Sequence, residues 1–121
     1  MNLPTVSVVM PVYNGARWLP DSLGSIVRQA VPGVELIVVD DGSSEDIASV
    51  VRAHYPAAAY FRQPNRGPAA ARNAGLSRAR GACIAFLDQD DSWPDGSLAL
   101  RLRALTDDPA ALFVLGRTRF V

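Results

Sequence analysis

Lysine is absent from this sequence of 121 residues, and its 12 basic residues are all arginines. Twelve acidic residues balance them, so a net charge of zero gives no general attraction for nucleic acids or other polyanions. Cysteine occurs once, at Cys83, which excludes an internal disulfide and fits a reducing compartment. Because Cys83 stands in an apolar stretch, we expect a buried side chain rather than a nucleophile.

Long apolar segments are also missing. No apolar run reaches the roughly 20 residues that cross a bilayer, and residues 1–5 lack the basic and apolar parts of a signal peptide. We therefore expect a cytoplasmic protein, with a peripheral position at the inner face of the membrane left open. A hydrophobic content of 49% with 20% charged residues is typical of a globular protein, and the length suits a single domain over residues 1–121.

Strand and helix patterns alternate along the chain. Short β-branched or apolar runs predict strands, and apolar residues at helical spacing predict helices between them. The predicted strands are residues 6–10, 36–39, 58–62, 83–87 and 112–115, and the predicted helices cover residues 19–30, 46–51, 69–80 and 98–105. This order predicts an α/β fold with a mostly parallel central sheet and helices on both faces.

Polar loops follow the first four predicted strands. They are residues 11–15, 40–43, 65–67 and 88–91. The carboxyl ends of parallel strands meet at one edge of a sheet, where ligands bind in folds of this class. Because two of these loops carry paired acids, which plain turns do not require, we predict a binding site at this edge.

The loop from Asp88 to Asp91 is the most informative of the four. Asp88, Asp90 and Asp91 follow directly after the apolar run that ends in Leu87. Crowded carboxylates repel one another unless a cation or solvent relieves them. Oxygen ligands without a nearby histidine or cysteine suit Mg²⁺ or Mn²⁺, which commonly bridge to substrate phosphates. Taken alone, such a motif is also compatible with a solvated acidic loop.

Other loop residues have chemistry that suits a nucleotide. Asp41 can accept a hydrogen bond from the N–H edge of a base. Tyr13 offers a flat face for stacking, although a core aromatic is equally compatible with the pattern. Arg72 is either a planar donor for a diphosphate or an ordinary solvated helix residue. Asp88 and Asp90 suit a ribose or a metal ion.

Taken in order, these motifs resemble family 2 glycosyltransferases over nearly the whole chain. The matching segments are Val6 to Asn14, Val38 to Ser43, Asn65 to Gly67, Ala70 to Asn73, Gly81, and Phe86 to Asp91. The resemblance implies the Rossmann-like GT-A fold, with a nucleotide-sugar-binding domain over residues 1–121 and the acceptor-side half absent. It also implies transfer of a sugar from a nucleotide-diphosphate sugar, expected to be a UDP-sugar, to an acceptor hydroxyl with inversion. The expected setting is bacterial polysaccharide or cell-wall glycan synthesis.

The family pattern also implies roles for single residues. Asp90 is the expected direct metal ligand and Asp88 lies nearer the ribose or shares the metal, with Mn²⁺ or Mg²⁺ as the cofactor. The implied nucleotide-binding residues are Pro11, Tyr13, Asn14, Asp41, Asn65, Arg72 and Asp88.

The catalytic base is the part of the pattern that this sequence does not supply clearly. In the family it is a carboxylate from a later segment, so it is expected beyond Val121, with Asp91 as a weak candidate. We therefore expect donor binding, with this chain alone inactive for lack of that base. The alternative is a catalytically silent nucleotide-sugar-binding or interaction module that keeps the fold. Apolar residues from Leu112 to Val121 leave a homodimer open.

Three other fold families fit less well. Phosphoacceptor receiver domains and haloacid-dehalogenase-like phosphatases place their acids after the first strand and usually use a lysine, whereas here Pro11 and Tyr13 follow that strand. A dinucleotide-binding dehydrogenase needs a G-x-G-x-x-G motif after a strand, which this sequence lacks. Near the acidic loop, Trp93 either floors the sugar site or anchors its own loop.

Overall fold

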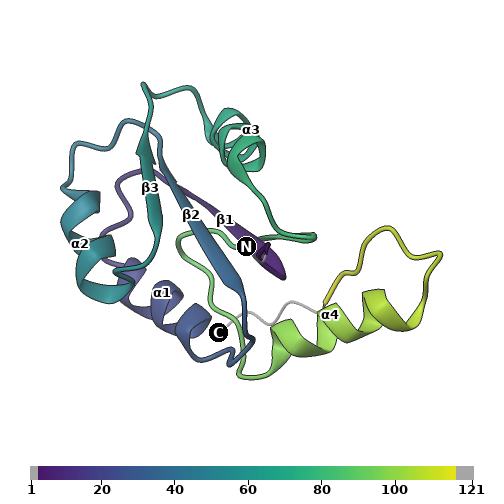
Figure 1. Ribbon diagram of the computed structural model, residues 1–121. Helices are drawn as coiled ribbons and strands as arrows, with labels where there is room; N and C mark the ends of the chain where they lie inside the picture. The colour runs from purple at the N-terminus through teal and green to yellow at the C-terminus, as the bar shows by residue number, and fades with distance from the viewer. Residues whose placement is uncertain (1–2, 117–121) are drawn as a thin grey trace.

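Four parallel strands form a sheet with the order β3-β2-β1-β4 in the computed structural model, which describes residues 3–116 (Figure 1). The elements, in chain order, are β1 (Val6–Val12), α1 (Leu19–Val27), β2 (Val34–Asp40), α2 (Ile47–His54), β3 (Ala59–Arg62), α3 (Pro68–Arg78), β4 (Cys83–Phe86) and α4 (Ser97–Asp107). The α/β architecture therefore matches the alternation predicted from the sequence. None of the helices in this part of the chain is long and apolar enough to cross a membrane.

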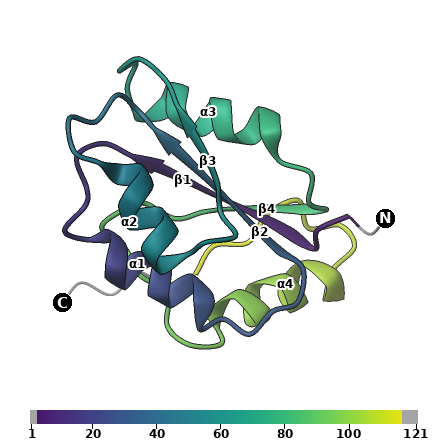
Figure 2. The same ribbon diagram turned by 60° about the vertical axis from the view of Figure 1, so that its left-hand side comes forward.

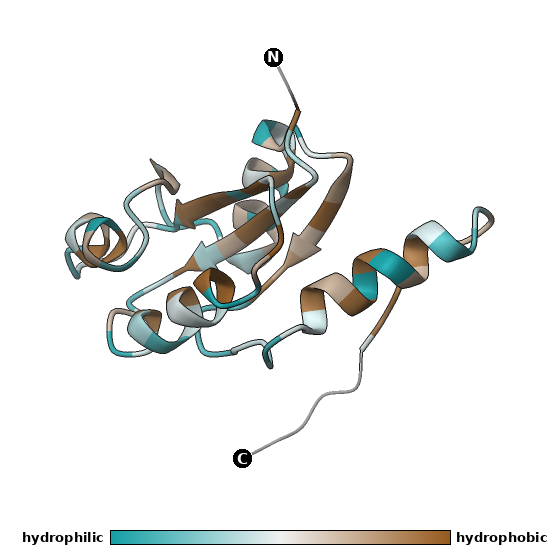
Figure 3. Cartoon of the chain, turned by 60° about the horizontal axis from the view of Figure 1, so that its bottom comes forward, coloured by the Kyte–Doolittle hydropathy of each residue, from teal (hydrophilic) through white to brown (hydrophobic). Residues whose placement is uncertain are grey.

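Helices cover both faces of the sheet, but unequally. Figure 2 shows α3 above the sheet and α1, α2 and α4 below it. The larger core lies on the lower face, where side chains such as Met10, Leu23 and Val38 are fully buried. The upper core, beneath α3, is smaller, and its buried apolar members include Ile37, Val39 and Ala71 together with Val9. The strands are the most apolar part of the molecule, whereas α4 mixes apolar and polar residues (Figure 3).

β1 is longer than the predicted strand of residues 6–10. It continues through Pro11 and ends at Val12. Proline lacks a backbone N–H and normally interrupts a central strand. Here the pairing of β1 with β4 covers only Val6 to Val9, so the position of Pro11 needs no donor toward β4. On its other side β1 stays paired with β2 as far as Val12.

The predicted strand at residues 112–115 is wrong. The described residues 112–116 form no strand, because none of the described strands pairs with them. Leu112, Phe113 and Leu115 are largely exposed. Residues 117–121 lie outside the described part of the chain. They belong to the apolar segment that could form a homodimer, so the homodimer stays a prediction.

Glycine allows α3 to lie close to the sheet. A Cβ atom added at Gly75 would stand 2.4 Å from Cγ1 of Val9 and 3.3 Å from Cγ2 of Val39. Both are β-branched core side chains, with little freedom to move aside. Together with Ala71, this glycine sets how near the helix approaches β1 and β2.

We expect Gly75→Ala to destabilise the protein by about 1–3 kcal/mol, because overpacking outweighs the better helix propensity of alanine. Gly24→Ala is the matched control inside α1. A Cβ there would meet only the end of the flexible Arg28 side chain, at 3.1 Å, so this change should stabilise by up to about 1 kcal/mol. Urea unfolding of the two variants measures both effects. A stabilised Gly75→Ala protein would contradict the close packing.

Candidate functional site

A cleft of about 400 Å³ lies at the carboxyl edge of the sheet. Its lining residues are Pro11, Val12, Tyr13, Asp41, Asn65, Gly67, Pro68, Ala71, Arg72, Asp88, Gln89 and Asp90. All the predicted nucleotide- and metal-binding residues except Asn14 line it, whereas Asp91, the weak candidate for the base, does not. A larger cleft of about 810 Å³ between α4 and β4 is lined mostly by apolar residues, so the polar chemistry belongs to the smaller one.

Asp41 organises the loop that follows β3. Its carboxylate accepts hydrogen bonds from Nε2 of Gln63 at 2.9 Å and from the backbone N–H groups of Arg66 and Gly67 at 2.8 and 2.9 Å. Burial alone would raise the pKa of Asp41. The hydrogen bonds from Gln63 and the two backbone amides outweigh it, and they bring the pKa below the usual value. Asp41 is therefore a buried, ionised carboxylate.

The bonds of Asp41 are divided unequally between its two oxygens. Oδ1 accepts from Gln63 and Arg66, whereas Oδ2 accepts only from Gly67 among the described residues. Each carboxylate oxygen has two acceptor positions. One position on Oδ2 is thus left for an N–H group in the cleft.

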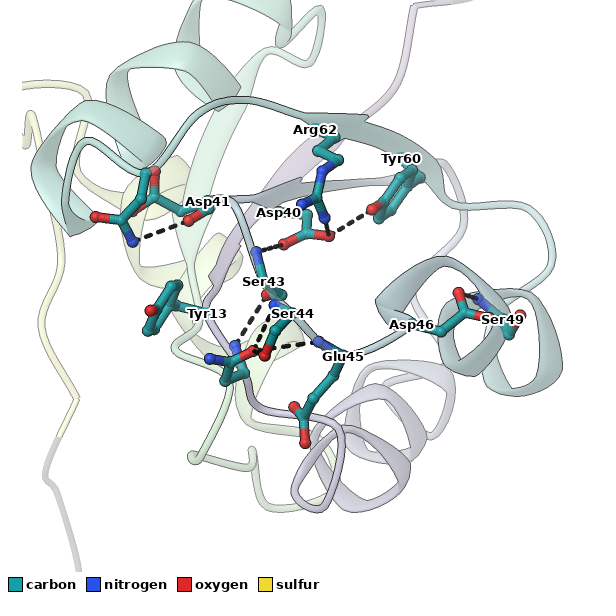
Figure 4. A network of polar contacts seen from close by, with 12 residues as sticks. Tyr13, Asp40, Asp41, Ser43, Ser44, Glu45, Asp46, Ser49, Tyr60 and Arg62 are labelled. Carbon is teal, nitrogen blue, oxygen red and sulfur yellow. Dashed lines mark hydrogen bonds and ion pairs between the residues drawn. The ribbon is translucent and has the colours of Figure 1, made fainter.

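Asp40, the neighbour of Asp41 in the sequence, points the other way. It is fully buried and accepts hydrogen bonds from the Tyr60 hydroxyl, from Arg62 at 3.1 Å and from the Ser43 backbone at 3.0 Å (Figure 4). Burial and the bond to Asp40 raise the pKa of Tyr60. Asp40 therefore fastens β2 to β3. The sequence showed an acid pair but carried no signal for this division, since the partners lie on another strand.

Asn14 does not line the cleft, contrary to its predicted place. Its backbone has a φ of 48°, and its Oδ1 accepts hydrogen bonds from the backbone N–H groups of Ser44 and Glu45 at 2.9 and 3.3 Å. Its own N–H donates to Oγ of Ser43 at 2.9 Å. Asn14 thus ties the loop after β1 to the turn before α2.

Tyr13 is 50% exposed and lines the cleft, which excludes the alternative of a core aromatic. Its ring is available as a surface for a flat ligand. Tyr13 is also joined through its main chain to Gln89, a cleft residue that sequence reasoning missed. The only hint in the sequence was an amide placed between Asp88 and Asp90.

Arg72 faces the acidic loop rather than open solvent. Its guanidinium pairs with Oδ1 of Asp88 at 2.9 Å, and both residues line the cleft. Since both side chains are about two-fifths exposed, the pair adds little to stability, and either group can change partner. Arg72 is therefore a partly exposed, ion-paired residue of the cleft lining, and its role as a diphosphate donor stays a prediction.

The acidic loop has the chemistry of a hard-cation site but no complete set of ligands. Partial burial and the charges of Asp90 and Asp88 raise the pKa of Asp91. Among residues 3–116, no three side chains of the metal-binding types come together. Mg²⁺ and Mn²⁺ typically bind through one or two carboxylates plus substrate phosphates, so the residues present fit such an ion bound together with a ligand.

The loop beyond the acids is anchored to α1. Trp93 is buried, and its backbone N–H donates to Oγ of Ser25 at 3.1 Å. The buried Gln29 donates to the carbonyl of Pro94 at 3.1 Å and accepts from the N–H of Leu98 at 3.0 Å. Of the two interpretations of Trp93, the loop anchor is the one that these contacts support.

The family model for glycosyl transferase family 2 matches residues 7–121, nearly the whole chain. The chain belongs to glycosyl transferase family 2. It is 42% identical over 95 residues to an uncharacterized glycosyltransferase of Haemophilus influenzae, a match that covers 75% of this chain and 38% of that protein. The predicted family is therefore confirmed.

Solved structures confirm the GT-A fold. The mannosyltransferase PcManGT from Pyrobaculum calidifontis, in complex with GDP-Man and Mn²⁺, matches with a TM-score of 0.80 and 32% identity over 90% of this chain. TarS 1–349 of S. aureus in complex with UDP-GlcNAc matches with a TM-score of 0.76 and 28% identity over 84% of this chain. The chain spans about a third of each of these proteins, 34% and 31%.

Asp41→Asn should lower the free energy of unfolding at pH 7 by about 1–3 kcal/mol, because an amide cannot accept all three hydrogen bonds. The pKa of Asp41 is lowered in the folded state. Its stabilising contribution is therefore complete above the unfolded-state pKa of about 3.9, and it is lost as the pH falls through the folded pKa. Urea unfolding should show the two proteins converging below about pH 4. A constant difference, or one that Asp107→Asn also produces, would contradict this role.

Proposed function

We propose that the cleft of this family 2 chain binds the nucleotide part of a nucleotide-diphosphate sugar. In this proposal residues 1–121 are the donor-binding part of an enzyme that transfers the sugar to an acceptor hydroxyl with inversion. One observation supports this proposal. A single cleft brings together an exposed aromatic ring, an acceptor position on a buried carboxylate, an arginine and two acids. They are Tyr13, Asp41, Arg72, Asp88 and Asp90.

The nucleoside end is proposed to lie between Tyr13 and Asp41. The ring of Tyr13 stacks on the base, and Oδ2 of Asp41 accepts its N–H. One acceptor position suits a base with a single N–H on its pairing edge, such as uracil, better than guanine, which presents two neighbouring donors. This argument favours uracil or thymine over guanine. A UDP-sugar is proposed because TarS was solved with UDP-GlcNAc, whereas PcManGT was solved with GDP-Man.

The diphosphate end is proposed to lie between Arg72 and the acidic loop. Arg72 can exchange Asp88 for phosphate oxygens, to which it presents a planar pair of donors. Asp90 is the proposed metal ligand, and Asp88 shares the metal or meets the ribose. A bound divalent ion would supply Lewis-acid stabilisation of the leaving diphosphate. PcManGT, whose structure contains Mn²⁺ together with GDP-Man, supports a divalent ion in proteins of this fold.

Transfer to the acceptor hydroxyl needs a catalytic base, which is proposed to lie beyond Val121. Asp91 remains the weaker candidate: its raised pKa makes it more basic than an ordinary aspartate, but two acids lie close to it. The chain is 32% identical over 117 residues to TuaG of Bacillus subtilis, which is named a putative teichuronic acid biosynthesis glycosyltransferase. That name supports bacterial cell-wall glycan synthesis as the proposed setting, and a cytoplasmic location is proposed with it.

Calorimetric titration of the chain with UDP, with and without Mn²⁺, tests the donor site. We expect binding that depends on Mn²⁺, with GDP weaker than UDP because Asp41 offers one acceptor position. Tighter binding of GDP or dTDP would replace uridine as the base while keeping the donor site. Failure of all three nucleotides to bind would contradict the proposal and favour an interaction module that keeps only the fold.

Asp90→Asn should raise the Kd for UDP in the presence of Mn²⁺ by about tenfold or more, since even outer partners of metal ligands have effects of that size. The fold should stay intact or gain slightly in stability, because repulsion with Asp88 and Asp91 is relieved. Asp107→Asn removes an exposed charge at the far end of α4 and serves as the control. Equal UDP affinity in Asp90→Asn and the unmodified chain would exclude Asp90 as a metal ligand.

A further inference from the structure

Gln89 makes two hydrogen bonds to the main chain of one residue. Its Oε1 accepts from the N–H of Tyr13 at 2.9 Å, and its Nε2 donates to the carbonyl oxygen of Tyr13 at 3.2 Å. A single side-chain amide thus occupies both main-chain groups of Tyr13, in the way that the backbone of a neighbouring strand would.

The end of the pairing between β4 and β1 explains why a side chain, and not a backbone, bonds to Tyr13. β4 pairs with β1 from Cys83 to Phe86, and the N–H of Leu87 makes one more bond, to the carbonyl of Val9 at 3.2 Å. The next bond would need the N–H of Pro11, which proline lacks. The backbone therefore leaves β1 at this point and turns, with the N–H of Asp91 donating to the carbonyl of Asp88 at 3.1 Å.

The bridge of Gln89 spans the two sides of the cleft. Asp88 and Asp90, the neighbours of Gln89, carry carboxylates on one side, and Tyr13 carries its ring on the other. Among the described residues, the hydrogen bonds of Leu87 to Val9 and of Gln89 to Tyr13 are those that join this loop to β1 and the residue after it. Of these, the bonds of Gln89 act directly between the ring side and the carboxylate side of the cleft.

Gly15 leaves room for this bridge. A Cβ atom at residue 15 would stand 2.1 Å from Oε1 and 2.4 Å from Cδ of Gln89, so the amide would have to move aside. Gly15 is not among the glycines with a positive φ, so its backbone conformation does not require glycine. A side chain at position 15 would therefore compete with the Gln89 amide for the same space.

We propose that Gln89 is a positioning residue that holds the nucleoside side and the diphosphate side of the cleft at a fixed separation. This inference rests on the proposed donor site and adds a residue to it. Gln89 itself touches neither reacting group. It acts through Tyr13 on one side and through the backbone of Asp88 and Asp90 on the other.

Gln89→Ala tests the bridge through two readouts. The amide hydrogen of Tyr13 should exchange with solvent faster, while that of Asn14, which donates to Ser43, should not change. The Kd for UDP in the presence of Mn²⁺ should rise by about tenfold, the loss expected for one to two hydrogen bonds. The melting temperature should change little, because the bond to Tyr13 is exposed. Asn73→Ala, which removes an exposed amide of α3 outside the cleft lining, should alter neither readout.

The Gly15→Ala variant provides a second, linked test. Alone it should raise the Kd for UDP about as much as Gln89→Ala does, because the new methyl group displaces the amide. In the Gln89→Ala background it should add nothing, since the space is then empty. Losses that add up in the double variant would overturn the assigned role of Gly15 and with it the proposed bridge.

The readouts separate this inference from the proposed function. If the unmodified chain binds no nucleotide, the donor site is contradicted, and the positioning role falls with it, whatever amide exchange shows of the bridge. If the unmodified chain binds UDP and Gln89→Ala binds it equally well, the donor site stands and the positioning role is overturned. Unchanged exchange at Tyr13 in Gln89→Ala would overturn the bridge itself.

Discussion

A missing backbone donor at Pro11 is the constraint on which the cleft depends. β1 is the second-last strand of the sheet and would be expected to pair along its whole length on both sides. Because Pro11 offers no N–H, pairing toward β4 stops at the level of Leu87 while pairing toward β2 continues to Val12. The sheet therefore opens on one side only, and the space between the separated ends holds the polar groups of the site.

Hydrogen bonds hold the loops on both sides of this opening in place. The acidic loop is attached before, within and after its acids, by Leu87, Gln89 and Trp93 respectively. On the opposite side, the buried carboxylate of Asp41 holds the loop that leads into α3. Arg72 and Asp88, the groups assigned to the diphosphate end, are by contrast bonded through their side chains only to each other among the described residues. Rigid surroundings with exchangeable central groups are the arrangement that a binding site requires.

The sequence was sufficient for the architecture and for the place of the site. Alternating strand and helix patterns are local properties, and the rule that ligands gather at the carboxyl ends of parallel strands needs no side-chain detail. The roles of Asn14, Asp40 and Gln89 were not predictable in this way, because their partners lie 29, 20 and 76 residues away in the chain. The strand prediction for residues 112–115 was wrong for a related reason. An apolar run forms a strand only where a partner backbone lies beside it.

The uneven division of the core also bears on how the molecule moves. Beneath α3 the buried apolar side chains are few, with Val9 beside Ile37, Val39 and Ala71, and the helix gains its close approach from the absence of side-chain bulk at Gly75. A smaller buried apolar core means a lower free energy of local opening than on the opposite face, so α3 is the layer expected to open first. Arg72 and the loop bound by Asp41 belong to that layer. A molecule bound in the cleft contacts both this layer and the sheet, so its binding would stabilise α3 against such opening.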